Sequence, residues 1–389
     1  MEQEEPVFSR ITDKPADAIF GINDLFLIDN RKNKINLTVG ILIDEEGKSA
    51  QILPSVKLAE AEILKTNITK NYLPIDGDPE YVELTKKLVF GETDYSCIYG
   101  AQTVGGTSAL RILADFCKNE IGSRISMPDP TWENHENIFI RAGLIIDKYP
   151  YPIGMYEHIS KLPCGSIVLL HAMCHNPTGH DLTKSEWEKL EVLFQEKKLI
   201  PFFDTAYQGF GRGLDEDAFA IRYFMEKGHE CLIAHSYSKS FALYGERVGA
   251  LFIVMRNRAS ADLIKRNIRS LIRTAYSNPP RHGSSIVKLI LQDSNLRNMW
   301  EKELSASRCR IQKLRKILSI KLKGKCSHLK FPYLENGNGF FVLLGLSNEE
   351  AMRLRDEFAI YTAPKSRVNL TALNDKNIDL IVDSILRVT

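Results

Sequence analysis

The chain has 389 residues and a formal net charge of only +2, from 51 lysines and arginines against 49 aspartates and glutamates. This balance gives no long-range field for nucleic acid or a membrane surface, and no apolar stretch approaches the ~20 residues that span a bilayer. The acidic start "MEQEEPVFSR" has no apolar signal core, and the seven cysteines are scattered without a CxxC pair. We therefore expect a cytoplasmic protein with no nucleic-acid or membrane partner and, from its length, two domains.

Helical and strand-like stretches alternate along the first three quarters of the chain. "DPEYVELTKKLVFG" predicts a helix with Asp78 as N-cap, Pro79 in first position and Gly91 past its end. "TKSEWEKLEVLFQEKK" predicts another, which begins with a capping box of Thr183 and Glu186. The continuous apolar runs between such helices are typical of central strands covered on both faces: "SIVLLHAM", "LIPFFDTAY", "CLIAHSYS" and "GALFIVM". This alternation predicts an α/β fold with a mostly parallel sheet.

The last quarter of the chain has a different pattern. A long, basic helix is predicted from about residue 294 to 325, and we expect its charges to face solvent because aromatic residues are not interleaved with them. A strand-like "NGFFVLLGL", a helix capped by Ser347 with Glu350, and a last helix near residues 374–388 follow. We predict a large domain over residues 45–300, with residues 1–44 and 301–389 forming an N-terminal arm and a smaller α+β domain.

Polar residues follow each apolar run, where ligands of an open parallel sheet bind. They are His171 and Asn176 after the first run, Asp204 and Tyr207 after the second, and Ser236, Ser238 and Lys239 after the third. A glycine pair, Gly105 and Gly106, leads into a helix with Thr107 in its first turn, a start that suits a phosphate. Arg247 offers a further cation. The GxGxxG spacing of a dinucleotide site is missing, and "HAMCH" has no companion ligands, so we expect no metal.

These features share one chemical purpose. Taken singly, Lys239 could be a solvated loop lysine, Asp204 a helix cap and Asn176 part of a turn. Together, a phosphate site, a lysine, a carboxylate, a phenol and an amide are what pyridoxal 5'-phosphate needs. The lysine attaches the aldehyde, the carboxylate keeps the pyridine nitrogen protonated, and the phenol and amide bind the ring oxygen. The sequence therefore predicts a pyridoxal phosphate enzyme.

Nearly the whole chain also resembles the class I aminotransferases, most closely their aspartate aminotransferase branch. The resemblance is carried by "PADAIFGINDLF", "TKNYLPIDGDPEY", "AQTVGGTSALR", "HNPTG", "FFDTAYQGFGRGLDED", "SYSKSFALYGERVGA", "IRTAYSNPPRHG" and "SRVNLTAL". It implies the type I fold of pyridoxal phosphate-dependent transferases and a homodimer with shared active sites.

The resemblance also implies a role for each matching residue. Lys239 would carry the cofactor and move the proton at the substrate α-carbon, with Asp204 paired to the pyridinium nitrogen. Tyr207 and Asn176 would bind the ring oxygen, and Trp132 would stack on the ring. The implied phosphate ligands are Gly106, Thr107, Ser236, Ser238 and Arg247, with Tyr72 reaching the phosphate of the neighbouring subunit. Gly40, in the lid segment "VGILID", would contact substrate together with Trp132 and Asn176.

Two arginines would select the substrate. By resemblance, Arg367 grips the α-carboxylate, and Arg273 reaches the distal carboxylate from the partner subunit. This pair predicts a ping-pong transamination between L-aspartate and 2-oxoglutarate. The lid residues Ile41, Leu42 and Ile43 are more apolar than in typical aspartate enzymes and, like "LYGERVG", resemble the aromatic branch. The aspartate-type choices are Asn71, Thr107 and Asn278. Aromatic or dual specificity therefore stays open.

Two functions other than transamination are known on folds of this kind. A non-catalytic ligand sensor on the same fold usually lacks the lysine or carries an added DNA-binding segment, and this chain has Lys239 and no stretch that reads as such a segment. A lyase or decarboxylase is also compatible with the fold, but the pair Arg273 and Arg367 favours transamination.

Overall fold

The structure is a computed structural model that describes residues 6–12, 18–49, 52–66, 69–325 and 333–389. Residues 1–5 and 13–17 of the predicted N-terminal arm lie outside these ranges. Seven strands form the central sheet in the order β2-β8-β7-β6-β5-β3-β4. Their bounds are β2 Ile98–Val104, β3 Arg124–Asp129, β4 Ile145–Pro150, β5 Ile167–His171, β6 Ile200–Thr205, β7 Cys231–Ser236 and β8 Val248–Val254.

The sheet is mostly parallel, as the sequence predicts. Strands β4, β3, β5, β6 and β7 all run in the same direction, while β8 is antiparallel to both of its neighbours, β7 and β2. The predicted strands at "SIVLLHAM", "LIPFFDTAY", "CLIAHSYS" and "GALFIVM" are confirmed as β5, β6, β7 and β8. The parallel strands therefore bring their carboxyl ends, and the polar residues after them, to one edge.

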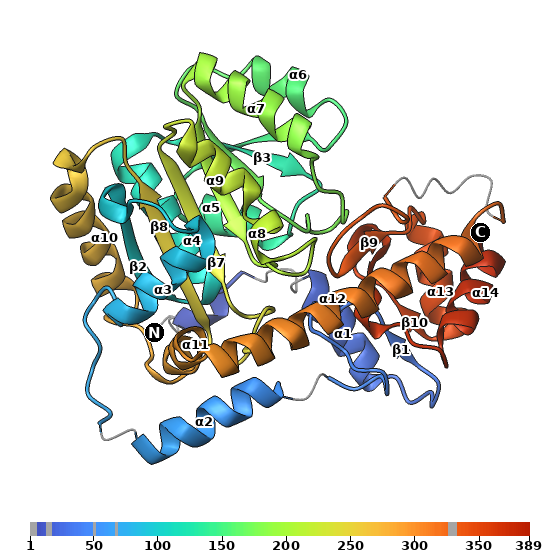
Figure 1. The fold of residues 1–389 in the computed structure, drawn as a ribbon. Coiled ribbons are helices and arrows are strands. Elements are labelled where there is room, and N and C mark those ends of the chain that lie inside the picture. Colours follow the sequence, from blue (N-terminus) through green and yellow to red (C-terminus); the bar gives the residue numbers. More distant parts are fainter. Residues whose placement is uncertain (1–5, 13–17, 50–51, 67–68, 326–332) are drawn as a thin grey trace, which may run out of the picture.

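Helices cover both faces of the sheet (Figure 1). On one face lie α4 (Gly105–Phe116), α5 (Asn134–Arg141) and α10 (Ala261–Ala275). The other face is covered by α3 (Pro79–Phe90), α6 (Met155–Ser160), α7 (Lys184–Lys197), α9 (Phe219–Glu226) and α11 (His282–Gln292). Along β7, Leu232 and Ala234 pack in the first layer and Ile233 in the second. Both sets are buried, which is why the strand sequence is apolar throughout.

The predicted helix caps are confirmed. Asp78 Oδ1 accepts from the backbone N–H of Glu80 at 2.9 Å, and Gly91 follows α3 with a φ of +72°. Thr183 and Glu186 form the reciprocal capping box at the start of α7. Each cap satisfies backbone groups that the helix itself leaves without a partner.

A second group of elements joins the two ends of the chain (Figure 1). Strand β1 (Ile35–Asn36) pairs in parallel with β10 (Ile360–Tyr361), and β9 (Phe341–Leu343) pairs antiparallel with β11 (Arg367–Asn369). The remaining helices are α1 (Ala18–Ile28), α2 (Pro54–Thr66), α8 (Leu214–Asp217), α12 (Ser294–Leu322), α13 (Asn348–Phe358) and α14 (Ile378–Val388). Short helical turns lie at Val7–Arg10, Tyr95–Cys97, Cys117–Ile121, Arg258–Ser260, Pro364–Ser366 and Leu370–Ala372. The predicted boundary at residues 300/301 falls inside α12, and the division into domains stays a prediction.

The expectation that the charges of this long helix face solvent is wrong for two arginines. Arg315 is buried and donates to the carbonyl oxygens of Tyr333, Asn338, Gly339 and Phe341 at 2.8–3.2 Å. Arg310 donates to carbonyl oxygens at residues 43, 44, 371 and 373. Most of these carbonyls belong to irregular segments outside the named strands, while Phe341 begins β9, and the guanidinium groups supply hydrogen bonds to them. Lys313 and Lys316 are exposed, as expected.

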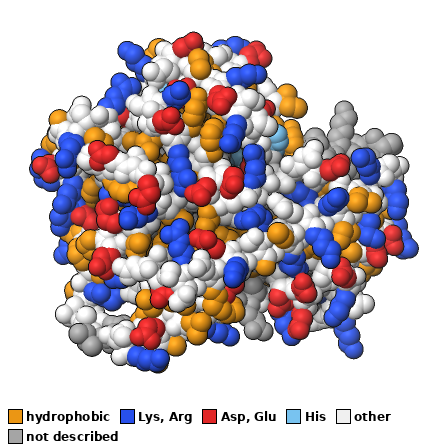
Figure 2. Space-filling view, in the orientation of Figure 1, with side chains coloured by type: hydrophobic (Ala, Val, Ile, Leu, Met, Phe, Trp, Pro, Cys, Tyr) orange, Lys and Arg blue, Asp and Glu red, His pale blue; other side chains and the backbone are white. Residues whose placement is uncertain are grey.

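The surface carries charges of both signs. On the face shown in Figure 2, lysines and arginines are interspersed with aspartates and glutamates. Among the described residues, no helix has the length and apolar character required to cross a membrane.

Candidate active site

A cavity of about 420 Å³ lies at the carboxyl ends of β5, β6 and β7. It is also lined from β11, from the start of α4 and from the segment after β1. The structure brings together in it twelve of the predicted site residues: Gly40, Gly106, Thr107, Trp132, Asn176, Asp204, Tyr207, Ser236, Ser238, Lys239, Arg247 and Arg367. Residues as far apart as 40 and 367 thus meet at the sheet edge where ligands of parallel sheets bind.

One end of the cavity is built as an anion cradle. Gly105 has a φ of +72°, and a Cβ added to it would come within 2.6 Å of Arg247 Nη2. A Cβ on Gly106 would lie 2.8 Å from Ser236 Cβ. Glycine is therefore required at both positions. No side chain caps the start of α4, whose first amides and positive dipole end stay available next to the Arg247 guanidinium and the serine hydroxyls.

The hydroxyls of this cradle are already oriented by one another. Ser236 Oγ lies 3.2 Å from Ser238 Oγ, and Arg247 Nη1 donates to Ser238 Oγ at 3.3 Å and to the Tyr244 carbonyl at 3.2 Å. A cation, two hydroxyls and free amides around one small volume are the donor set of a phosphate site.

Lys239 follows β7 and lies partly buried in the same cavity. Its Nζ is 5.1 Å from the centre of the Tyr207 ring. Burial lowers the pKa of Lys239 to about 8; Asp204 opposes this shift, while Arg247 and Arg367 add to it. An amine with a pKa this low is neutral often enough near neutral pH to act as nucleophile and base.

Asp204 is bound from behind by a chain of hydrogen bonds. His135 Nε2 lies 3.0 Å from Asp204 Oδ2, and Thr131 Oγ1 lies 2.9 Å from both His135 Nδ1 and His171 Nε2. The backbone N–H of Asn176 donates to His171 Nδ1 at 3.4 Å. Burial alone would raise the pKa of Asp204, but the hydrogen bond and charge of His135, with smaller contributions from His171 and Lys239, bring it below its usual value.

One arrangement of protons that satisfies every link of this chain starts at Asn176. The amide of Asn176 donates to His171, which donates through Nε2 to the Thr131 hydroxyl. That hydroxyl then donates to His135 Nδ1, and His135 donates through Nε2 to Asp204. His171 is neutral in this arrangement, in agreement with burial, which lowers its pKa to about 3. Asp204 Oδ2 is thereby engaged, which leaves Oδ1 for a ligand in the cavity.

His135, His171 and Asp204 also have the composition of a metal site, with ligand atoms within 4.8 Å of one another. The hydrogen bonds described above, however, use Nε2 of both histidines and Oδ2 of the aspartate. The arrangement is that of a proton-ordered network rather than an open ligand set.

Arg367, the first residue of β11, is almost fully buried at the other end of the cavity. Its Nη1 donates to Asn176 Oδ1 at 3.1 Å and its Nη2 to the Thr38 carbonyl at 2.9 Å, while Phe341 packs against the guanidinium plane. Burial lowers the pKa of Arg367, opposed by Glu133. Nε has no hydrogen-bond partner within the described ranges, so the guanidinium keeps donors for a carboxylate.

The lid segment 39–43 is fastened to the end of β11. Asn369 Nδ2 donates to the carbonyls of Val39 and Ile41 at 2.7 and 2.8 Å, and the Leu42 N–H donates to the hydroxyl of Tyr244 at 2.8 Å. Of the three apolar lid residues, only Ile41 lines the cavity; Leu42 is buried in the core, and Ile43 packs against it. A Cβ on Gly40 would lie 3.0 Å from the Phe341 ring, so glycine allows this close packing.

Two predicted site residues lie outside the cavity. Tyr72 is 89% exposed, and Arg273 is exposed near the end of α10, where it donates to Ser277 Oγ. The segments that carry them are in contact, because Asn278 Nδ2 donates to the Leu73 carbonyl at 3.1 Å and Arg281 to the Asn71 carbonyl at 3.1 Å. Both side chains therefore project from neighbouring parts of one surface.

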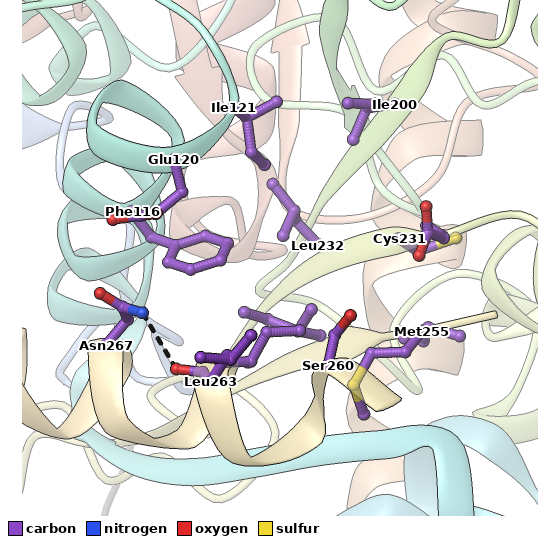
Figure 3. A pocket seen from close by; sticks show the side chains of 14 residues that line it. Phe116, Glu120, Ile121, Ile200, Cys231, Leu232, Met255, Ser260, Leu263 and Asn267 are labelled. Carbon is purple, nitrogen blue, oxygen red and sulfur yellow. Dashed lines mark hydrogen bonds between the residues drawn. The ribbon is translucent and has the colours of Figure 1, made fainter. Parts of the chain in front are cut away.

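A second cavity, of about 390 Å³, lies at the opposite edge of the sheet, at the start of β6 and β7 (Figure 3). Its walls are mostly apolar, with Phe116 and Leu232 among them, and its charged lining residues, Glu120 and Glu230, are both acidic. It therefore does not suit a phosphate or a carboxylate. The candidate active site is the first cavity, at the carboxyl ends of the strands.

Sequence reasoning missed several residues of the site. Thr131 and His135 stand four residues apart in "PTWENHENI", the first before α5 and the second in its first turn, but nothing local indicates that they lie behind Asp204. Tyr244, Phe341 and Glu133 likewise reach the cavity or its arginine only through tertiary packing.

The donor set fits pyridoxal 5'-phosphate: an anion cradle, a lysine with a lowered pKa, a carboxylate with one free oxygen, and a phenol near the lysine. The chain matches the family described as aminotransferase class I and II over residues 32–385. The chain belongs to this family. The predicted pyridoxal phosphate cofactor, enzyme class and type I fold are thereby confirmed.

Individual relatives cover the chain almost completely. It is 42% identical to an aspartate aminotransferase of Salmonella typhi, over 98% of this chain and 100% of the relative. It is 36% identical to an aromatic-amino-acid aminotransferase of Pseudomonas aeruginosa, over 98% of each. The structure superposes with a TM-score of 0.94 on an aromatic-amino-acid aminotransferase from Burkholderia pseudomallei covalently bound to pyridoxal phosphate, at 37% identity, covering 99% of this chain and 100% of that one.

Proposed function

We propose that this aminotransferase exchanges the amino group between L-aspartate and 2-oxoglutarate in a ping-pong reaction. The observation that carries the proposal is one cavity with a lysine of lowered pKa and two arginines, Arg247 in the anion cradle and Arg367 with unused donors. One guanidinium serves the cofactor phosphate and the other the substrate α-carboxylate. Identity to aspartate aminotransferases over the full length supports the choice of substrate.

Different residues of the cavity would bind different parts of the cofactor. Gly106, Thr107, Ser236, Ser238 and Arg247 would hold the phosphate. Asp204 Oδ1 would accept a hydrogen bond from the protonated pyridine nitrogen, Tyr207 and Asn176 would donate to the ring oxygen, and Trp132 would lie against the ring. When bound, pyridoxal phosphate links covalently to an amine and withdraws electrons from the substrate α-carbon.

Lys239 and Asp204 are the residues that would control proton transfer. With its lowered pKa, the neutral Nζ of Lys239 would take the proton from the substrate α-carbon and hold it for its later return. Asp204 stays ionised because His135 donates to it, so the ring nitrogen keeps its proton. The lid segment 39–43 and Phe341 would exclude water around Arg367.

The distal carboxylate of aspartate needs a second cation, and we propose that Arg273 of the partner subunit supplies it. Tyr72 and Arg273 project from one surface and lie outside the cavity of their own chain, as shared sites in a homodimer require. A cytoplasmic location is part of the proposal; the six described cysteines, which form no disulfide, are compatible with it.

Aromatic amino acids are a second candidate substrate class. The cavity wall includes the apolar side chains of Val39, Ile41 and Leu110, on which an aromatic ring could pack. Full-length identity to an aromatic-amino-acid aminotransferase supports this candidate.

The test is a comparison of kcat/KM for aspartate, tyrosine and phenylalanine with 2-oxoglutarate as amino acceptor. We expect aspartate to be the best substrate and the aromatic amino acids to be accepted more slowly. A higher kcat/KM for tyrosine or phenylalanine would make this an aromatic aminotransferase, and no turnover of any of the three would reject the proposal.

A further inference from the structure

A carboxylate stands next to the arginine that is proposed to grip the substrate. Glu133 follows Trp132 directly, and its Oε2 lies 3.6 Å from Arg367 Nη1. This oxygen is buried and has no hydrogen-bond partner in the part of the chain that the structure describes. The distance is that of an ion pair but too long for a hydrogen bond.

This carboxylate does not serve as a helix cap. Glu133 occupies the N-cap position of α5, yet its side chain accepts no capping hydrogen bond there. The other contacts of Arg367, with Asn176, the Thr38 carbonyl and the Phe341 ring, are all with neutral groups. Within the described residues, Glu133 is thus the one acidic side chain paired with Arg367.

A buried guanidinium without a counter-ion is costly, so Glu133 lowers that cost while the cavity holds no substrate. When a substrate carboxylate approaches Arg367, it also approaches Glu133, and the two anions repel each other. This repulsion grows with the number of negative charges on the ligand, since a cavity shielded from solvent screens charges weakly.

We propose that Glu133 is the resident counter-ion of Arg367 and a specificity-determining residue that disfavours doubly charged substrates relative to singly charged ones. It lets an enzyme with dicarboxylate-binding arginines accept monocarboxylic amino acids in competition with aspartate. The inference rests on the proposed role of Arg367 in binding the substrate carboxylate.

The experiment measures binding of unreactive carboxylates to the holoenzyme by titration calorimetry, so that it does not depend on turnover. Succinate serves as the dicarboxylate and 3-phenylpropanoate as the monocarboxylate. In Glu133→Gln we expect the dissociation constant to fall about 10-fold for succinate and only about 3-fold for 3-phenylpropanoate. The ratio of kcat/KM for aspartate over phenylalanine should rise in the same direction.

Glu136→Gln is the matched control. Glu136 lies on the same helix, is partly exposed and pairs with Lys148 at 2.7 Å, so its removal changes the net charge equally at a solvated position. We expect it to change both dissociation constants by less than about 2-fold. Glu133→Asp, which keeps the charge, should retain the wild-type preference and shows whether side-chain shape alone matters.

Unchanged or weaker succinate binding in Glu133→Gln would overturn the inference, and so would equal gains for both ligands. Arg367→Leu tests the premise separately. If succinate bound Arg367→Leu as tightly as wild type, the proposed role of Arg367 would be rejected. If succinate bound Arg367→Leu weakly but its dissociation constant for Glu133→Gln equalled that of wild type, only the role of Glu133 would be rejected.

Discussion

The ammonium group of Lys239 lies 5.1 Å from the ring centre of Tyr207, and no carboxylate among the described residues forms an ion pair with it. The cation thus lies next to an aromatic face in a cavity that removes it from solvent, and the nearby charges of Asp204 on one side and Arg247 and Arg367 on the other act on its pKa in opposite directions. A lysine in this environment prefers to react or to lose its proton.

Replacing Lys239 by alanine should abolish transamination, with a loss of more than ~10³-fold in kcat, because nucleophile and base disappear together. Borohydride treatment of the wild-type holoenzyme should fix the cofactor on the peptide that contains Lys239, as read by mass spectrometry. Lys313→Ala, on the exposed side of α12, is the control and should label as wild type does. Label on another lysine would contradict the assignment.

The lowered pKa of Lys239 also predicts how stability of the apoenzyme depends on pH. Below about pH 8 the amine is protonated in both folded and unfolded chains, so the folded state bears the full cost of the buried charge. Between about pH 8 and its ordinary pKa of 10.5, only the unfolded chain binds the proton, and the cost fades as pH rises. Lys239→Met should therefore stabilise the apoenzyme by about 2 kcal/mol at pH 7 and by less at pH 9.5, measured by urea unfolding. An equal gain at both pH values would mean that packing, not charge, is responsible.

Thr131 joins the two histidines behind Asp204, and valine has nearly the same shape without the hydroxyl. Thr131→Val should lower the free energy of unfolding by ~1–3 kcal/mol, because His135 Nδ1 and His171 Nε2 lose their buried partner. It should also lower kcat, since the ring of His135 is no longer fixed in the tautomer that donates to Asp204. Thr131→Ser restores the hydroxyl and should recover both the free energy of unfolding and kcat. If it recovered neither, the hydrogen bonds of Thr131 would have no part in fixing His135 for catalysis.

Arg273→Asp should lower kcat/KM for aspartate by ~10²-fold or more and have much less effect on phenylalanine, because it opposes the distal carboxylate with a like charge. Arg266→Asp, an exposed residue of the same helix, is the control. Equal losses for both substrates would separate Arg273 from the distal carboxylate.

Shared active sites predict complementation between inactive chains. After Lys239→Ala and Arg273→Asp chains are unfolded and refolded together, mixed dimers contain one site with both native residues. We expect about a quarter of the wild-type aspartate activity, the share of native sites in a random mixture of dimers. Activity no higher than that of the separate variants would argue against a site built from two subunits.

Arg315 supplies hydrogen bonds to carbonyls of the segment that leads into Phe341, a residue of the cavity wall. Arg315→Met should lower the free energy of unfolding by at least ~3 kcal/mol, because several carbonyls lose the hydrogen bonds that Arg315 donates to them. The free energy of unfolding of Arg315→Lys should lie between those of Arg315→Met and wild type. That of Lys313→Met, on the exposed side of the same helix, should be close to the wild-type value. Urea unfolding of the three variants gives the comparison.

Local sequence predicted those parts of the fold whose causes are local. The caps at Asp78 and Thr183 and the apolar runs of β5 to β8 were all found, because capping and burial of a strand on both faces leave their mark within a few residues. The polar residues at the strand ends were also found, since a parallel sheet brings those ends to one edge. The antiparallel direction of β8 was not predicted, because the sequence of a strand says little about the direction in which it pairs.

The roles of charged residues far from their partners were decided by tertiary structure. The sequence predicted Arg315 to be one of several solvated charges on a basic helix, and no role was predicted for Glu133. Each owes its environment to segments distant in sequence, the carbonyls near residue 340 for one and β11 for the other. A side chain's electrostatic role depends on the groups that surround it in space, and the tertiary structure determines which groups these are.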